Sequence, residues 1–174
     1  MRSSDWWAYS HQLPDGTLNI RHTNFKYLKT NTPRFESRSD LDREKNAINA
    51  FLGSFNLSAK KLGPHDIDYK MFDNDGKAIC YVEVKGRLRD IKDAYPLPIA
   101  ARKLVKLSDK DLAGIIIWAC NDGIIFGDPS KLKGTARYGG RTPRPGAAND
   151  QEIMIYYNKQ DNLEWKTTSL KEKQ

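Results

Sequence analysis

Residues 65–87 constrain the fold more than any other segment, because they contain two strand-like runs around a tight turn. HDIDYKMF and KAICYVEVKG are rich in strand-forming residues, and the DNDG between them is a strong β-hairpin signal. With Asp75 and Gly76 as a two-residue turn, Asn74 lies opposite Lys77. The segment therefore predicts an antiparallel strand pair whose register follows from the turn.

This register places charged side chains together near the open end of the hairpin. Asp68 lies opposite Glu83, and Asp66 lies opposite Lys85. Because residues two apart on a strand point to the same face of a sheet, all four side chains are expected on one face. The hairpin therefore predicts a cluster of carboxylates around one ammonium group.

Such a cluster suits metal-assisted hydrolysis of a phosphodiester. Neighbouring carboxylates repel each other and need a cation, and a hard ion such as Mg²⁺ binds carboxylate oxygens and water. Lys85 beside the ion can orient a water molecule or stabilise the charge that develops on a phosphate. The alternative is a ladder of ion pairs on a solvated face, with Lys85 paired to Asp66 and each pair contributing roughly 0.2–1 kcal/mol. The site is favoured because Glu83 and Lys85 follow the apolar run of a buried strand.

A helix is predicted over residues 37–54, SRSDLDREKNAINAFLGS. Ser37 or Ser39 can cap its start, and Gly53 can end it. Its apolar stripe consists of Leu41, Ile48, Phe51 and Leu52. Glu44 falls on the same stripe at helical spacing. This glutamate is either an edge residue that pairs with a neighbour or a carboxylate directed inward at the site.

The remaining patterns complete the order of elements. DAYPLPIAARKLVKLSDKD predicts a short helix from about Pro98, and AGIIIWAC predicts a strand buried on both faces. Further strands are predicted at IIFGD, EIMIYYNK and LEWKTTSL, whereas the Gly-, Pro- and Arg-rich residues 133–150 predict an exposed, mobile loop. This order predicts a single α/β (α+β) domain over residues 1–174, with a mixed central β-sheet flanked by helices and a core at about 37–128.

The order of these motifs resembles that of the PD-(D/E)XK nuclease superfamily, which includes restriction enzymes, junction resolvases and phage nucleases. A helix glutamate is followed by a strand aspartate, then by E-V-K-G at residues 83–86 on the paired strand, then by a helix and an apolar strand. The resemblance covers about residues 44–128. It implies a restriction-endonuclease-like fold and a metal-dependent nuclease that hydrolyses DNA with Mg²⁺ or Mn²⁺.

The resemblance also implies roles for individual residues. Glu83 corresponds to a metal ligand, Lys85 to the catalytic lysine and Glu44 to the helix carboxylate. One of Asp66 and Asp68 corresponds to the metal-binding aspartate. Asp68 fits the hairpin register, whereas Asp66 stands at the strand start, where the family often has its aspartate. The family's proline usually precedes that aspartate directly, and here His65 separates Pro64 from Asp66.

The net charge of +7 favours polyanionic partners, above all nucleic acid. The candidate DNA-binding residues follow the hairpin, lie on the second helix or belong to the basic loop: Arg87, Arg89, Arg102, Lys103, Lys106, Lys133, Arg137, Arg141 and Arg144. Each of them taken singly can instead be a solvated charge. Two other functions stay open, namely a catalytically inactive nucleic-acid-binding domain with the same fold, and an interaction protein whose basic loop meets an acidic partner.

The location expected for the chain is cytoplasmic. Neither a membrane-spanning apolar run nor a secretory signal is visible, so no membrane partner is expected. Cys80 and Cys120 lie in apolar runs, which indicates buried free thiols in a reducing compartment. The small size and basic charge suit a stand-alone, phage-encoded or junction-type nuclease, and many relatives cut two strands as homodimers.

Overall fold

The computed structural model describes residues 10–12, 18–20, 37–63, 66–140, 151–162 and 166–169. Internal contacts divide the chain into two units, Met1–Glu36 and Ser37–Gln174. In the first unit, β1 (Ser10–Gln12) pairs antiparallel with β2 (Leu18–Ile20). The single domain over residues 1–174 stays a prediction, and the second unit contains the whole of the predicted core.

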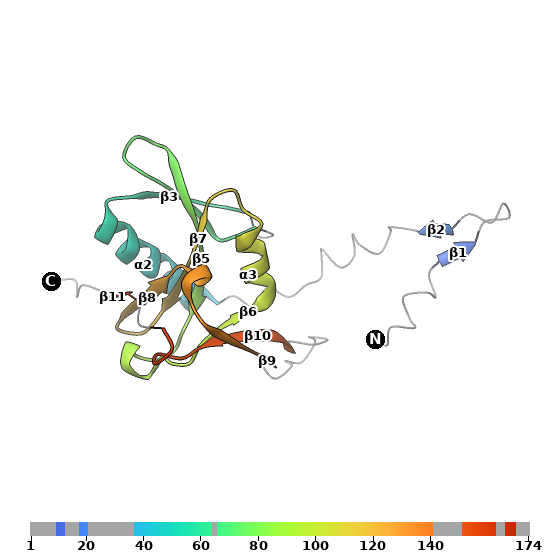
Figure 1. Ribbon diagram of the computed structural model, residues 1–174. Helices are drawn as coiled ribbons and strands as arrows, with labels where there is room; N and C mark the ends of the chain where they lie inside the picture. The colour runs from blue at the N-terminus through green and yellow to red at the C-terminus, as the bar shows by residue number, and fades with distance from the viewer. Residues whose placement is uncertain are drawn as a thin grey trace. The chain divides into compact units, whose positions relative to one another are not determined.

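A six-stranded mixed sheet forms the centre of the second unit (Figure 1). Its strands, in spatial order, are β11 (Lys166–Ser169), β8 (Gly123–Gly127), β7 (Ala113–Ala119), β5 (Ala78–Gly86), β4 (Tyr69–Phe72) and β3 (Ser58–Lys61). β5 and β7 are parallel, and every other neighbouring pair is antiparallel. The predicted mixed sheet is confirmed.

The predicted hairpin is β4–β5, and its register is confirmed away from the turn. Tyr69 pairs with Val82, and Met71 pairs with Cys80. One residue beyond the Tyr69 pair, the same register brings Asp68 level with Glu83. The part of the prediction that bears on the candidate site is therefore correct.

The turn of this hairpin is one residue longer than predicted. The N–H of Asp73 donates to the carbonyl of Lys77 at 3.0 Å, which leaves three residues between them. Gly76 has a φ of 76°, a left-handed conformation that glycine adopts without a steric penalty. A register shift follows, so that Phe72 pairs with Ala78. This β-bulge absorbs the extra turn residue before the strands reach the site.

Helix α2 (Arg38–Phe55) begins as predicted but ends later. The hydroxyl of Ser37 accepts the N–H of Asp40, and the Asp40 carboxylate accepts the N–H of Ser37, which is a capping box. The helix continues past Gly53 to a left-handed C-cap at Asn56. Phe55 in this extra turn packs against the rings of two other phenylalanines, which offsets the roughly 1 kcal/mol cost of a glycine inside a helix.

The second helix, α3 (Ala101–Ser108), begins three residues later than predicted. The preceding segment forms β6 (Leu97–Ala100), which pairs with β10 (Gln151–Tyr157). β6 is an edge strand, where the missing N–H of Pro98 is tolerated. The proline therefore belongs to a strand rather than to the first turn of the helix.

A third correction concerns the predicted loop over residues 133–150. Residues Gly134–Gly140 form β9, which pairs with β10 along its whole length to give the three-stranded sheet β6-β10-β9. Nearly every residue of β9 is exposed, so its sequence has no apolar alternation that could reveal a strand. Residues 141–150 of that segment lie outside the described residues.

The two faces of the central sheet are covered by different elements. Figure 1 shows α2 on one side of β5 and β7, and α3 on the other side. Val82, Val84 and Ile117 belong to the core cluster that includes α2, whereas Ile116 and Trp118 belong to the cluster that includes β6 and α3. β7 is therefore buried on both faces as predicted. The architecture is the expected α+β, restriction-endonuclease-like sheet flanked by helices.

Smaller predictions can also be compared with the structure. Cys80 and Cys120 are buried free thiols, as predicted. Two 3₁₀ helices, η2 (Ile91–Asp93) and η3 (Pro129–Lys131), follow β5 and β8 along the chain. None of the helices in the described ranges is long and apolar enough to cross a membrane.

Candidate active site

Strand β5 directs its charged side chains toward α3. Tyr81 belongs to the core cluster on the α3 side, and Glu83 and Lys85 follow it at intervals of two residues. The Glu83 side chain is 0% exposed. A buried carboxylate needs positive charge nearby, because burial removes its hydration.

Two ammonium groups supply this charge. The Nζ of Lys85 lies 3.0 Å from Glu83 Oε1, and the Nζ of Lys103 on α3 lies 2.7 Å from the same oxygen. Neither oxygen of Glu83 accepts a hydrogen bond of good geometry from any described residue. The ammonium groups are therefore within ion-pair distance but do not satisfy the carboxylate as fixed donors would.

Asp68 is the second carboxylate of the site. The backbone N–H of Val84 donates to Asp68 Oδ2 at 2.8 Å, which fixes the aspartate against β5 between Glu83 and Lys85. Burial, and then the negative charge of Glu83, raise the pKa of Asp68 to about 6. The Val84 N–H and the two lysines oppose this shift. The pair Asp68–Glu83 therefore favours an additional proton or cation.

Asp66 lies in a different environment. Its Oδ1 is 2.6 Å from the Nζ of Lys110, and this ion pair lowers the pKa of Asp66. The predicted position of Asp66 opposite Lys85 is wrong, because strand pairing ends at Tyr69 and the Asp66 N–H instead donates to the Gly63 carbonyl. Of the two aspartates, the structure brings Asp68 to Glu83.

Glu44 is held on the opposite face of the sheet. Its Oε1 accepts hydrogen bonds from the Tyr69 hydroxyl and from the Lys61 ammonium, both at 2.7 Å. Tyr69 belongs to the core cluster on the α2 side, and α2 itself covers that face. The inward-directed carboxylate implied by the resemblance is therefore engaged by β3 and β4 and is not directed toward Glu83.

The sequence interpretation named Lys103 as a DNA-binding residue but missed its place beside Glu83. The Lys103 side chain is only 15% exposed and reaches Glu83. Its spacing in the sequence could have indicated an inward position, because Lys103 comes three residues after buried Ala100 and four before buried Leu107. The same spacing drew attention to Glu44 on the first helix.

Several other basic candidates have structural partners. Arg87 donates through Nε to the Ala94 carbonyl at 2.7 Å, and burial lowers its pKa. Arg89 makes a long contact of 3.5 Å with the carbonyl of Asp93. Arg102 pairs with Glu152 at 2.7 Å and is two-thirds exposed. These arginines brace the segments around β5, β6 and β10.

The remaining basic candidates differ in their surroundings. Lys106 is half-buried on α3, and its charge contributes to the lowered pKa of Asp66. Lys133 and Arg137 are exposed, beside and on β9. Arg141 and Arg144 lie outside the described residues. Lys133 and Arg137 are therefore open to solvent on the three-stranded sheet.

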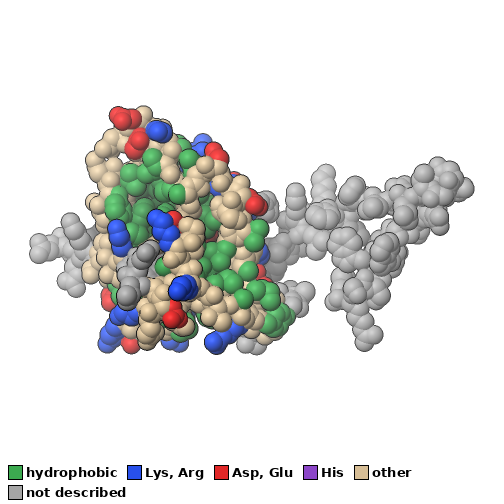
Figure 2. Space-filling view, in the orientation of Figure 1, with side chains coloured by type: hydrophobic (Ala, Val, Ile, Leu, Met, Phe, Trp, Pro, Cys, Tyr) green, Lys and Arg blue, Asp and Glu red, His purple; other side chains and the backbone are tan. Residues whose placement is uncertain are grey.

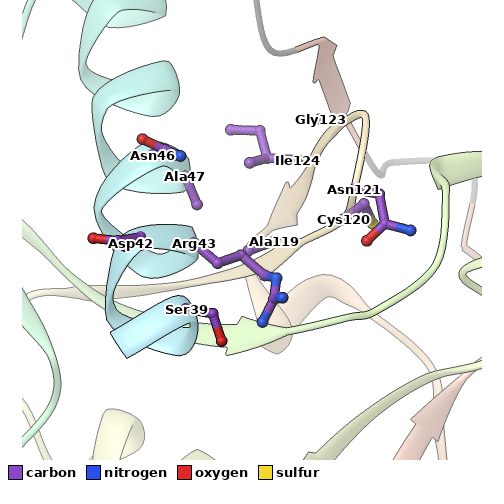
Figure 3. A pocket seen from close by; sticks show the side chains of 10 residues that line it. All are labelled: Ser39, Asp42, Arg43, Asn46, Ala47, Ala119, Cys120, Asn121, Gly123 and Ile124. Atoms are coloured by element: carbon purple, nitrogen blue, oxygen red, sulfur yellow. The ribbon is translucent and has the colours of Figure 1, made fainter. Parts of the chain in front are cut away.

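A pocket of about 340 Å³ lies apart from these carboxylates (Figure 3). Figure 3 shows the Arg43 side chain of α2 extending toward residues at and beyond the end of β7, whereas the Asp42 carboxylate points away from them. The predicted site residues do not line it. This pocket lies beside α2, whereas Asp68 and Glu83 face α3, so the pocket and the buried carboxylates are on opposite faces of the sheet.

The chemistry of the Asp68–Glu83 pair fits a hard divalent ion. Within the described ranges, three or more carboxylate, imidazole or thiol side chains do not converge in one place. Two carboxylates are nevertheless sufficient for Mg²⁺, which usually keeps several water ligands. The buried Glu83 oxygens without a hydrogen-bond donor and the raised pKa of Asp68 are the observations that agree with such an ion.

The fold and this site define a protein of the restriction-endonuclease-like class, with an aspartate immediately before β4 and a Glu-x-Lys motif on the adjacent strand β5. Residues 30–162 match the family described as "phage putative PDDEXK endonuclease". Because the match covers more than half of the chain, the protein belongs to this family and to the PD-(D/E)XK nucleases, as the motif order predicted. No curated protein and no solved structure matches the chain.

Proposed function

We propose that this protein is a metal-dependent nuclease that hydrolyses DNA phosphodiester bonds. The observation that carries the proposal is the convergence of Asp68, Glu83 and Lys85 at the end of β5, in a chain of the PDDEXK endonuclease family. Asp68 and Glu83 hold Mg²⁺ or Mn²⁺ in this proposal. When bound, such an ion polarises the phosphate and lowers the pKa of a coordinated water.

Lys85 performs the remaining chemistry. Its side chain is about one-third exposed, whereas Glu83 beside it is fully buried, so its ammonium group stands between the interior and the approaching substrate. From there it orients the attacking water and stabilises the negative charge that develops on the phosphate oxygens. Water oxygen bonds to phosphorus and gives up a proton to solvent, the bond to the leaving sugar oxygen breaks, and that oxygen takes up a proton from solvent.

The surface charge supports DNA as the substrate. The net charge is +7, and Lys133 and Arg137 are exposed on and beside the β9 strand. Figure 2 shows Lys and Arg side chains along the lower margin of the described unit, interspersed with Asp and Glu. Contacts with phosphates would give binding that weakens with salt. We also propose a homodimer as the form that cuts both strands of a duplex.

Lys85→Ala tests the proposal directly. Plasmid cleavage is measured with Mg²⁺, with Mn²⁺ and with a chelator. The wild-type protein is expected to cleave only with a divalent ion, and Lys85→Ala to lose about 10²–10³-fold in rate. Lys92→Ala is the charge-matched control, because Lys92 is 78% exposed and its nearest carboxylate is 4.0 Å away. Full activity of folded Lys85→Ala would contradict the proposal.

A catalytically inactive DNA-binding domain is the second candidate. One observation favours it, namely that Lys85 and Lys103 already neutralise Glu83 without a metal ion. Under this alternative the wild-type protein binds DNA in a salt-sensitive manner. It then shows neither heat of Mn²⁺ binding in calorimetry nor cleavage at any divalent-ion concentration.

A further inference from the structure

Glu83 has one more cation than a Glu-x-Lys motif provides. Lys85 belongs to the motif, whereas Lys103 comes from α3, an element that the motif does not include. Its Nζ is nevertheless the nearer of the two to Glu83 Oε1, at 2.7 Å compared with 3.0 Å. Its side chain is also the more buried, at 15% exposed compared with 32%. Lys103 therefore occupies the inner position beside the carboxylates.

The local charges explain why this position matters. Two carboxylates and two ammonium groups form a nearly neutral cluster, and the charges of both lysines act on Asp68 as well. A divalent ion held by Asp68 and Glu83 would face both ammonium groups within a few ångströms, where like charges repel strongly. Binding of such an ion would therefore favour the departure of one ammonium group.

We infer that Lys103 is the counter-ion of Glu83 in the metal-free protein, and that its ammonium group would leave Glu83 and pair with the scissile phosphate when Asp68 and Glu83 hold a divalent ion. Lys85 shares a strand with Glu83, so its stem keeps it on the same face beside the carboxylate. Lys103 reaches the site from a separate helix through a flexible four-carbon stem. This inference rests on the proposed nuclease function, and it gives Lys103, already a candidate DNA-binding residue, a second role as the counter-ion of Glu83.

A DNA phosphate is the anion with which the displaced Lys103 ammonium group would pair. A DNA phosphate that approaches the ion brings a new negative charge to the place where Glu83 has lost its partner. Arg102, the neighbouring cation on α3, is already paired with Glu152 at 2.7 Å. Lys103 is therefore the cation of α3 that exchanges a carboxylate for a phosphate.

Lys103→Met removes the charge and keeps most of the stem. We expect its affinity for Mn²⁺, measured by calorimetry, to rise at least about fivefold, because a competing cation is gone. Its kcat/KM for DNA at saturating Mn²⁺ is expected to fall at least about tenfold, because a phosphate contact is lost. Lys92→Met, with the same loss of charge at an exposed position, is expected to change neither value. Unchanged Mn²⁺ affinity in Lys103→Met, or a lower one, would overturn the inference.

A measurement on the wild-type protein keeps the test independent of how the variant folds. Reductive methylation of lysine amines is followed by mass spectrometry with and without Mg²⁺. Mg²⁺ is expected to accelerate modification of Lys103 severalfold, because its ammonium group leaves the buried pair, and to leave Lys92 unchanged. Equal Lys103 modification with and without Mg²⁺, at a concentration that calorimetry shows to be saturating, overturns the exchange.

The two proposals fail separately. If the wild-type protein cleaves DNA while Lys103→Met keeps wild-type Mn²⁺ affinity, the nuclease function stands and the exchange is wrong. If Mn²⁺ binds and Lys103 is released but DNA is never cleaved, the exchange at the metal site stands and the nuclease function is wrong, together with the transfer to a scissile phosphate.

Discussion

Each face of the central sheet holds a carboxylate among apolar residues. The two carboxylates differ in the partners that surround them. On the α2 face, Glu44 receives hydrogen bonds from a tyrosine hydroxyl and a lysine, both at 2.7 Å. On the α3 face, Glu83 is fully buried, has two ammonium groups near one oxygen and accepts no well-formed hydrogen bond from the described residues. A carboxylate satisfied by hydrogen bonds from neighbouring side chains serves the fold, whereas one that has ion pairs but no well-formed hydrogen bond is suited to binding a ligand.

The largest expected effect is a difference in DNA cleavage rate between variants of Glu83 and of Glu44. Glu83→Gln removes one of the two carboxylate charges proposed to hold the divalent ion, and cleavage of plasmid DNA is expected to fall by about 10²–10³-fold. Glu44→Gln is expected to remain within about threefold of the wild-type rate. Initial rates at saturating Mg²⁺ give both values. A large loss in Glu44→Gln would place this glutamate in the catalytic site and remove the distinction between the two faces.

An intermediate effect concerns the stability of the metal-free protein. The pKa of Asp68 is about 6, above its usual value near 3.8, so the folded state binds the proton more tightly than the unfolded state does. Ionised Asp68 therefore costs stability above about pH 6, and this cost disappears as the pH falls toward 4. Asp68→Asn is expected to be more stable than the wild-type protein by about 2 kcal/mol at pH 7 and by little at pH 4.

Urea denaturation of metal-free wild-type protein and Asp68→Asn, at several pH values, measures this difference. Asp75→Asn in the exposed turn is the control, since it removes a carboxylate far from the buried pair. If the stability difference between the wild-type protein and Asp68→Asn does not vary with pH, burial beside Glu83 does not raise the pKa of Asp68. Saturating Mg²⁺ is expected to narrow the difference at pH 7, because the ion stabilises only the wild-type site.

The smallest effect lies on the α2 face. Tyr69→Phe removes the hydroxyl that donates to Glu44, and the free energy of unfolding is expected to fall by about 1–2 kcal/mol. Mn²⁺ affinity is expected to stay unchanged. Chemical denaturation measures the free energy of unfolding, and calorimetry measures the Mn²⁺ affinity. Altered metal affinity in Tyr69→Phe would show that the two faces are coupled through β4.

Local patterns predicted the elements better than the contacts between them. The strand pair β4–β5, the doubly buried β7 and the capped start of α2 all follow from short-range rules, and the structure contains them. The β9 strand did not follow, because an exposed strand paired on one side has no alternation to detect. Because nearly all of β9 is exposed, its sequence lacks the apolar alternation on which strand prediction depends.

The candidate site shows the same limit. Helical spacing placed Glu44 on an inward stripe, but which layer α2 covers depends on the tertiary fold. Lys103 has the identical spacing on α3 but was predicted only as a DNA-binding residue, and it is the side chain that meets Glu83. The choice between Asp66 and Asp68 also needed the structure, since it depends on where the chain leaves β4 and on the partner that Lys110 provides.

The bulge near the tip of the β4–β5 hairpin has a practical consequence. The pairing of the strands at the site does not depend on the length of the turn, because the bulge shifts the register between Phe72 and Met71. Residues 74–77 are exposed, so the tip can accept a fluorescent label or a short insertion. The hairpin thus offers a reporter position on the strands that carry Asp68 and Glu83, from which arrival of DNA could be followed in solution.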